Sequence, residues 1–141
     1  MSTSRQWSMR LHDDFQPEFE ALVPDVQDAL LAAARAVEIA GPRTGRPHVD
    51  TLNGSKHKNM KELRFTAASG SQVWRAAFAF DPNREGIILV AADKQGMNQK
   101  QFYKSLVNKA DERFDEHLET IRLKMSGTKV EHKAAKRARK P

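Results

Sequence analysis

The segment VWRAAFAFDPNREGIILVAADK, residues 73–94, determines the kind of fold that the chain can adopt. In its first part, aromatic residues such as Trp74 and Phe78 alternate with Arg75 and small residues, which is typical of a strand with one buried face. The DPN triplet that follows predicts a turn. The next stretch, Gly86–Lys94, is apolar almost throughout, as expected for a central strand. The segment therefore predicts a hairpin with an arginine on the side away from its aromatic residues.

The segment MKELRFT, Met60–Thr66, alternates in the same way and predicts the preceding strand. Leu63 and Phe65 share one face, and Glu62 and Arg64 share the other. Short connections favour an antiparallel meander of the three strands. If the aromatic faces pack against helices, the two arginine-bearing faces form one open surface. Two guanidinium groups on neighbouring strands can hold an anion through paired hydrogen bonds.

The remaining elements flank this meander. We expect a strand over Arg5–Leu11, helices over Asp13–Leu22 and Pro24–Gly41, and a long basic loop over Gly41–Asn59. A last helix is expected to begin after Asn98, with Asn98 as its N-cap, and to end at Gly127. The order is β-α-α-β-β-β-α, which predicts an α+β fold with a mostly antiparallel twisted sheet and helices packed on one face. We expect one domain over residues 1–125 and a basic, flexible C-terminal tail over residues 126–141.

The composition excludes several kinds of site. The chain has 141 residues and a net charge of +6, with a pI of about 9.8, which favours a polyanionic partner such as RNA. It has no cysteine, which excludes disulfides, thiolate metal sites and cysteine nucleophiles and fits a reducing cytoplasm. No apolar run approaches the roughly 20 residues that span a bilayer, so we expect no membrane partner. No metal or cofactor site is expected from the motifs.

Three motifs together resemble one protein family. They are MKELRF (60–65), VWRAAFAFDPNREGIILVAADKQG (73–96) and QKQFYKSLVNKADERFDEHL (99–118). In this combination they resemble the phage-derived HigB-like branch of the RelE/ParE superfamily, the toxins of type II toxin–antitoxin modules. The resemblance implies a RelE-like fold and a cytoplasmic toxin that cleaves mRNA on the ribosome without a cofactor. It also implies a cognate helix-turn-helix antitoxin of the HigA type, which holds the toxin inactive.

The resemblance also implies roles for individual residues. Cleavage through the 2′-hydroxyl requires a base, stabilisation of the phosphate and an acid for the leaving oxygen. Arg75 resembles the strand arginine that stabilises the scissile phosphate, and Arg64 resembles a second phosphate contact. Lys94 either holds the phosphate or protonates the leaving group, and Tyr103 stacks on a base or takes part in proton transfer. The alternative for Arg75 is a surface arginine paired with Glu62.

Three further basic residues are candidates for binding RNA or phosphate. His57 lies in the basic loop, and Lys104 follows Tyr103 at the start of the last helix. Lys61 is a weaker match, because strict alternation places it on the aromatic side of its strand. The RelE pattern has two lysines on that strand, and this chain has Glu62 at one comparable place. Each of the three can also be an ordinary solvent-exposed side chain.

Two other functions remain open from the sequence. One is a non-enzymatic inhibitor of DNA gyrase, of the ParE type, on the same scaffold. The other is a basic nucleic-acid-binding or phage accessory protein that uses the tail over residues 129–140. Convergence of Arg75, Lys94 and Tyr103 on one face would favour the ribonuclease, whereas a paired and occluded Arg75 together with a buried Tyr103 would favour the inhibitor.

Overall fold

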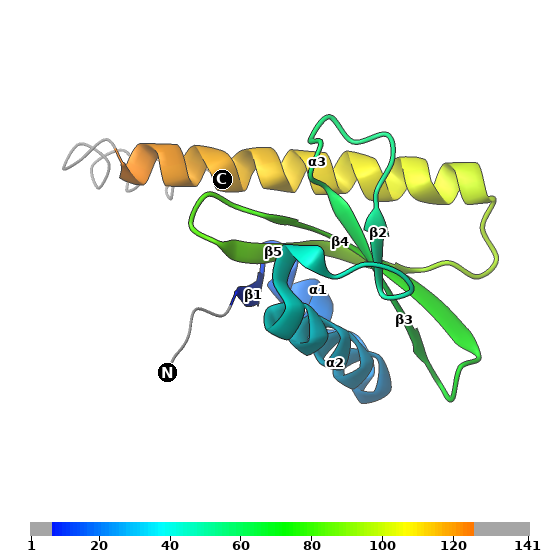
Figure 1. The fold of residues 1–141 in the computed structure, drawn as a ribbon. Coiled ribbons are helices and arrows are strands. Elements are labelled where there is room, and N and C mark those ends of the chain that lie inside the picture. Colours follow the sequence, from blue (N-terminus) through cyan, green and yellow to red (C-terminus); the bar gives the residue numbers. More distant parts are fainter. Residues whose placement is uncertain (1–6, 126–141) are drawn as a thin grey trace.

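The computed structural model describes residues 7–125, which form a five-stranded sheet with helices around it (Figure 1). In chain order the elements are β1 (Ser8–Leu11), α1 (Gln16–Glu20), α2 (Pro24–Ala40), the 3-10 helix η1 (Gly41–Arg43), β2 (Val49–Thr51), β3 (Lys61–Ala67), β4 (Gln72–Phe80), β5 (Glu85–Asp93) and α3 (Gln99–Lys124). The predicted α+β class is confirmed. The predicted tail over residues 126–141 and the predicted helix end at Gly127 lie outside the described residues.

The antiparallel meander β3-β4-β5 forms the middle of the sheet, whose strand order is β1-β5-β4-β3-β2. Arg64 on β3 lies opposite Arg75 on β4, so the two arginines are direct cross-strand neighbours. On the far side of β5, β1 adds in parallel, with Ser8 opposite Glu85. β5 therefore has a neighbouring strand on each edge, which confirms its predicted central position.

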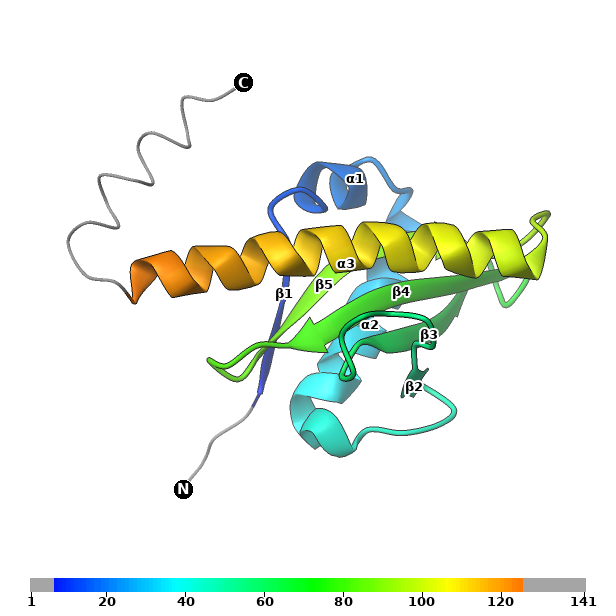
Figure 2. The same ribbon diagram turned by 90° about the horizontal axis from the view of Figure 1, so that it is seen from above.

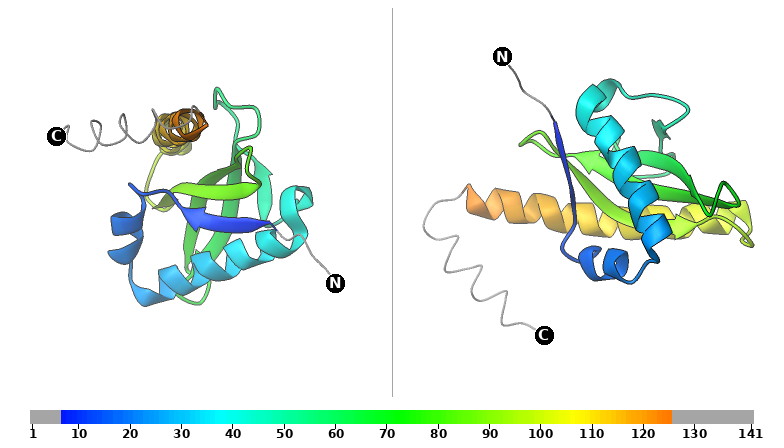
Figure 3. Two further views of the ribbon diagram at one scale, coloured as in Figure 1. Left: turned by 90° about the vertical axis from the view of Figure 1, so that its left-hand side faces the viewer. Right: turned by 90° about the horizontal axis from the view of Figure 1, so that it is seen from below.

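Helices cover both faces of the sheet, which corrects the prediction that they pack on one face. α2 packs against β3 and β1, whereas α3 lies across the opposite face, over β5 and β4 (Figures 2 and 3). Each face has its own apolar core. The α2-side core includes Leu63 and Phe78, and the α3-side core includes Ala77, Leu89 and Phe102.

The composition of β5 and β4 explains the second helical layer. Ile87 and Ile88 are both fully buried but belong to opposite cores, so β5 needs a cover on each side. On β4, the small side chains of Ala77 and Ala79 belong to the α3-side core and leave room for the helix. The face that bears Arg75 is therefore partly covered, and the arginine side chain is only 11% exposed.

The long loop predicted over Gly41–Asn59 contains two short ordered elements, η1 and β2. β2 pairs in antiparallel fashion with the start of β3, with Val49 opposite Leu63. Val49 is buried in the α2-side core, and this apolar contact helps to hold the strand in place. A strand of three residues in a polar segment has too few positions to show a periodic pattern.

The start of α3 agrees with the prediction. The side chain of Asn98 accepts a hydrogen bond from the backbone N–H of Gln101 at 3.1 Å, as an N-cap does. Further along the helix, Arg113 donates to the Glu18 carboxylate of α1 at 3.0 Å and to the Leu89 carbonyl of β5 at 2.7 Å. Polar contacts thus join α3 to α1 and to the sheet, in addition to the α3-side core.

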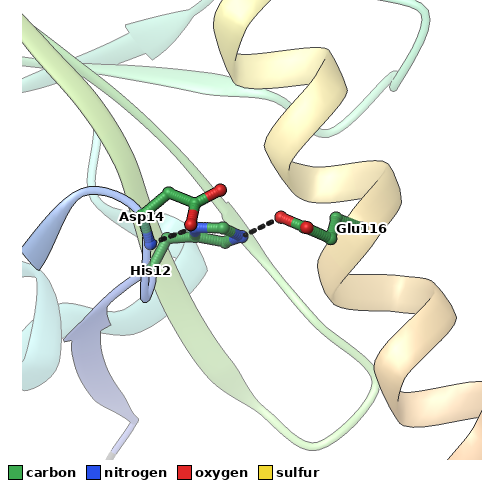
Figure 4. Close-up of side chains that lie close together, drawn as sticks. All are labelled: His12, Asp14 and Glu116. Atoms are coloured by element: carbon green, nitrogen blue, oxygen red, sulfur yellow. Dashed lines mark hydrogen bonds and ion pairs between the residues drawn. The ribbon is translucent and has the colours of Figure 1, made fainter. Parts of the chain in front are cut away.

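His12 links the end of β1 to α3 (Figure 4). Its Nε2 lies 3.3 Å from Oε1 of Glu116, and its Nδ1 accepts a hydrogen bond from the backbone N–H of Asp14 at 3.0 Å. Because Nδ1 is an acceptor, the neutral ring carries its proton on Nε2 and can donate it to Glu116. Burial lowers the pKa of His12, and the Asp14 and Glu116 carboxylates oppose part of this effect.

The buried neutral His12 predicts a loss of stability in mild acid. Its pKa in the folded protein lies below its value of about 6.5 in the unfolded chain, so the unfolded chain binds more protons between the two values. The free energy of unfolding should therefore fall as the pH drops below about 6.5. Urea unfolding at pH 7.5 and pH 5.5 measures this, with His12→Asn as the reference. Equal pH dependence of the wild type and the variant would contradict the prediction.

Candidate functional site

Four side chains from three elements meet on the α3 side of the sheet, and we call them the arginine cluster: Glu62 and Arg64 on β3, Arg75 on β4 and Tyr103 on α3. Nε of Arg64 lies 3.3 Å from Oε2 of Glu62, and Nε of Arg75 lies 3.9 Å from Oε1 of the same carboxylate. Alternation along the paired strands puts the three charged side chains on one face. A single buried carboxylate therefore lies within reach of two guanidinium groups.

Three atoms of this cluster are buried and form no hydrogen bond with any group among the described residues. They are Oε1 of Glu62, Nε of Arg64 and Nε of Arg75. Buried polar atoms in folded proteins almost always have a partner, and the exceptions point to a function or to an absent water or ion. Because these atoms face one another as ion pairs without hydrogen-bond geometry, the cluster keeps unused capacity to bind a ligand that carries both an anionic group and a hydroxyl.

The electrostatics of the cluster favour an anion. Two guanidinium groups against one carboxylate leave a net positive charge where Arg75 and Glu62 are largely removed from water. Burial, followed by the neighbouring Glu62 carboxylate, raises the pKa of the Tyr103 hydroxyl, and Arg75 offsets part of the shift. The tyrosine therefore stays protonated at neutral pH and is available as a proton donor. Arg75 is oriented by a hydrogen bond from its Nη1 to the Trp74 carbonyl at 2.9 Å.

Lys94 also lies at this site. Its Nζ is 5.7 Å from the centre of the Tyr103 ring, within the range of a cation–π contact. The backbone places it there, because the N–H of Lys94 donates to the Val73 carbonyl at 2.8 Å as β5 ends. The structure thus brings together Arg64, Arg75, Lys94 and Tyr103, as the sequence indicated. Their catalytic and binding roles stay predictions.

Lys61 and His57 lie elsewhere. Lys61 is on the α2 side of β3, one residue out of phase with the arginines. His57 Nε2 is 2.8 Å from Asp115 Oδ1, and its ring packs edge-on against Phe114. Asp115 is twelve residues along α3 from Tyr103, or about 18 Å along the helix axis. Neither residue joins the arginine cluster.

Lys104 is exposed on α3, one residue after Tyr103. Successive residues on a helix point about 100° apart, so Lys104 does not share the direction of the tyrosine side chain. It can contribute positive charge around the mouth of the site but lies outside the arginine cluster.

Glu62 is the member of the cluster whose role the sequence does not indicate. The alternating pattern places it beside Arg64, where it is expected to be an ion-pair partner or a replacement for a lysine. Only the packed structure reveals that Glu62 is 4% exposed and that one of its oxygens has no hydrogen-bond donor. The sequence signal that could have indicated its role was an acidic residue within a strand whose alternate residues are apolar.

His12, Asp14 and Glu116 also place ligand-type atoms close enough to hold a metal ion (Figure 4). The hydrogen bonds argue against this use. A histidine that binds a metal through one nitrogen normally donates a proton from the other to an acceptor. In this protein, Nδ1 of His12 faces the backbone N–H of Asp14, so the ring cannot free Nε2 for a metal while it keeps that contact. The three side chains fit a hydrogen-bonded link better than a metal centre.

The chain is similar in sequence to two toxins of one bacterium. The match to a toxin named HigB2 of Mycobacterium tuberculosis is 46% identical over 94 residues, which is 67% of this chain and 46% of that protein. The match to HigB3 of the same organism is 41% identical over 100 residues, or 71% of this chain and 83% of that protein. The chain thus spans about half the length of HigB2 and most of HigB3.

Among solved structures, a mutant of the Escherichia coli toxin RelE in the free state matches with a TM-score of 0.53 at 11% sequence identity. The match covers 74% of this chain and 97% of RelE and shows that the two share a fold. Residues 17–115, which include the arginine cluster, match the family of phage-derived Gp49-like proteins. Since this match spans well over half of the sequence, the chain belongs to the phage-derived Gp49-like family, and its resemblance to HigB-like toxins is confirmed.

Proposed function

We propose that this protein is the toxin of a toxin–antitoxin module and that it cleaves mRNA through the 2′-hydroxyl of the RNA. The observation that carries the proposal is the arginine cluster, which combines two guanidinium nitrogens and a carboxylate oxygen that form no hydrogen bond, together with a protonated tyrosine nearby. These groups are the base, the phosphate ligands and the acid that metal-independent RNA cleavage requires. The two relatives named as HigB toxins and the fold shared with RelE support the same conclusion.

In the proposed reaction, Arg64 and Arg75 bind the non-bridging oxygens of the scissile phosphate. Glu62 accepts the proton of the 2′-hydroxyl, whose oxygen then forms a bond to phosphorus. The bond from phosphorus to the 5′ oxygen breaks, and Tyr103 protonates that oxygen. Lys94 either stabilises the resulting tyrosinate or supplies the proton in its place. The products are a 2′,3′-cyclic phosphate and a 5′-hydroxyl, so no metal or external co-reactant is needed.

The biological partners follow from this proposal. The substrate would be mRNA on the ribosome, and the net charge of +6 favours association with ribosomal RNA. The cognate antitoxin would be a helix-turn-helix protein of the HigA type, and the toxin would act in the cytoplasm. No helix within residues 7–125 is long and apolar enough to cross a bilayer.

A second candidate function is inhibition of DNA gyrase by binding alone. The occlusion of Arg75 favours it, because the side chain is 11% exposed and already faces a carboxylate. Nε of the same side chain forms no hydrogen bond, which favours the ribonuclease instead, since a purely structural arginine would normally be fully hydrogen-bonded. Intact transcripts together with DNA damage after expression would support gyrase inhibition.

Replacing Arg75 with alanine should abolish most of the cleavage. Loss of a group that stabilises the charged transition state lowers the rate about 10²- to 10³-fold. Primer extension on mRNA from a translating extract measures the cut sites. Arg10→Ala is the matched control, because Arg10 is also a strand arginine but pairs with Glu85 outside the cluster. Equal cleavage by Arg75→Ala and Arg10→Ala would rule out the assigned role.

Glu62→Gln should reduce cleavage about 10²- to 10⁴-fold, the usual effect of losing a general base. The amide keeps the size of the side chain and can still accept a hydrogen bond from an arginine. The diagnostic measurement is the pH dependence of the rate. The rate of the wild type and the residual rate of the variant should depend differently on pH, because the variant lacks the general base. An unchanged pH profile would mean that Glu62 only positions the arginines.

Tyr103→Phe and Lys94→Ala distinguish the two candidate acids. A 5′-bridging sulfur makes a good leaving group that needs no proton, so it should restore the rate only when the acid has been removed. We expect Tyr103→Phe to cut normal RNA about 10²-fold more slowly and the sulfur-substituted RNA at nearly the wild-type rate. Rescue of Lys94→Ala alone would assign the acid to Lys94.

A further inference from the structure

A groove opens beside the arginine cluster, along the outer edge of β3. Its volume is about 560 Å³, within the range of pockets that bind small ligands. Ala33 and Ala36 of α2 contribute an apolar wall, and Thr66, Arg64 and Arg75 contribute from the sheet. We call this cavity the edge groove.

The edge groove contains a short free segment of strand. Pairing of β2 with β3 stops at Leu63, and the next outward N–H, that of Arg64, donates to the His48 carbonyl at 2.7 Å. Two steps further than Thr66, the N–H of Ala68 donates to Asp25 Oδ2 at 3.2 Å. Between these contacts only Thr66 presents its backbone N–H and C=O outward, because alternate residues on a strand face the same edge.

The inner pairing of the strands agrees with this orientation. Thr66 lies opposite Val73 on β4, and the Val73 carbonyl accepts from Lys94 on the β5 side. In an antiparallel ladder the N–H and C=O of one residue point to the same side of the strand. The backbone groups of Val73 therefore point to β5, Val73 and Thr66 form no hydrogen bond with each other, and the backbone N–H and C=O of Thr66 point away from β4. Thr66 itself is exposed.

The length of this free edge decides between two occupants. A peptide that adds to a sheet as a strand needs a row of free backbone groups. The edge groove offers one residue, with contacts to His48 and Asp25 closing the edge on either side. One donor beside one acceptor instead matches the edge of a nucleobase, which presents an acceptor next to a donor.

The two arginines of the arginine cluster also line the edge groove. Arg75 is 9% exposed, lines the groove and has a buried Nε without a hydrogen-bond partner. Arg64, which lines the groove as well, is two residues from Thr66 on the same strand, about 7 Å away. A single nucleotide spans such a distance between its phosphate and its base.

We propose that the edge groove binds one base of a single-stranded RNA, next to the phosphate held by Arg64 and Arg75. The backbone of Thr66 reads the hydrogen-bonding edge of the base, and the alanines of α2 contact its apolar face. This inference rests on the proposed function for the identity of the ligand as RNA. It adds a place where the protein contacts a base as well as the backbone of the RNA.

The test measures binding of RNA that cannot be cleaved. A short single-stranded RNA with 2′-O-methyl riboses is compared, by fluorescence anisotropy, with a series in which one base at a time is missing. Ala36→Leu, which fills the groove and keeps a good helix former, should weaken binding of the intact RNA about 10-fold, as loss of one hydrogen bond and its contacts does. The RNA that lacks the base held in the groove should bind equally to the wild type and to Ala36→Leu, because filling the groove then removes no contact.

Further variants exclude a folding defect. Ala40→Leu adds the same side chain at an exposed position of α2 outside the groove and should leave binding unchanged. Thr66→Pro removes the outward N–H together with the threonine side chain, and an edge strand tolerates proline. It should reproduce the effect of Ala36→Leu, whereas Thr66→Ala, which keeps the N–H, should not. The melting temperature of each variant reports whether it is folded.

The outcomes separate this inference from the proposed function. If the wild type cleaves mRNA but Ala36→Leu weakens binding of every base-less RNA as much as it weakens binding of the intact RNA, the groove assignment is wrong and the ribonuclease stands. If Ala36→Leu has no effect on one base-less RNA but no cleavage occurs, the groove stands and the ribonuclease fails. Loss of antitoxin binding in Ala36→Leu with normal RNA binding would make the groove a protein interface and overturn the assignment. Absence of RNA binding by the wild type would overturn it as well.

Discussion

The sharing of the Glu62 carboxylate between Arg64 and Arg75 is the interaction on which the site depends. Burial of one arginine in a sheet covered by helices is costly unless a counter-charge accompanies it. Glu62 supplies that charge but does not saturate it, since it faces two guanidinium groups at 3.3 and 3.9 Å. The result is a largely buried site with remaining positive charge, an arrangement that can stabilise a developing anion.

The second helical layer makes this arrangement possible. α3 buries the α3-side core with Phe102 and positions Tyr103 over the same face. Without α3, Arg75 would be a solvent-exposed strand arginine, whose ion pair with Glu62 would contribute little. Covering one part of the face thus turns surface charges into a site of low dielectric, and the N-terminal part of α3 completes that site with a protonated hydroxyl.

The edge of β3 has a related dependence on tertiary contacts. β2 protects only the first half of the strand, and the Asp25 carboxylate of α2 closes its far end. A free edge is normally a liability for association with other chains, and short free edges limit it. The gap at Thr66 is short enough to avoid strand addition and lies beside the two arginines, where a backbone donor and acceptor can act on a ligand.

The sequence alone determined the meander, the identity of the arginine face and the start of α3, because alternation, turn residues and the Asn98 cap are local signals. It did not determine which groups cover that face. Apolar β5 requires a cover on each side, but periodicity does not say which helix provides it, and a three-residue strand such as β2 has no pattern to detect.

The tertiary structure decided the composition of the site for the same reason. Hydrogen-bond partners and burial depend on segments far apart in the chain, and these made Glu62 a central group and took His57 away to Asp115. Alternation assigns a side chain to a face, whereas packing determines what it meets there. The sequence therefore specified Arg75 and its direction, and only the folded chain provided the carboxylate, the tyrosine and the groove around it.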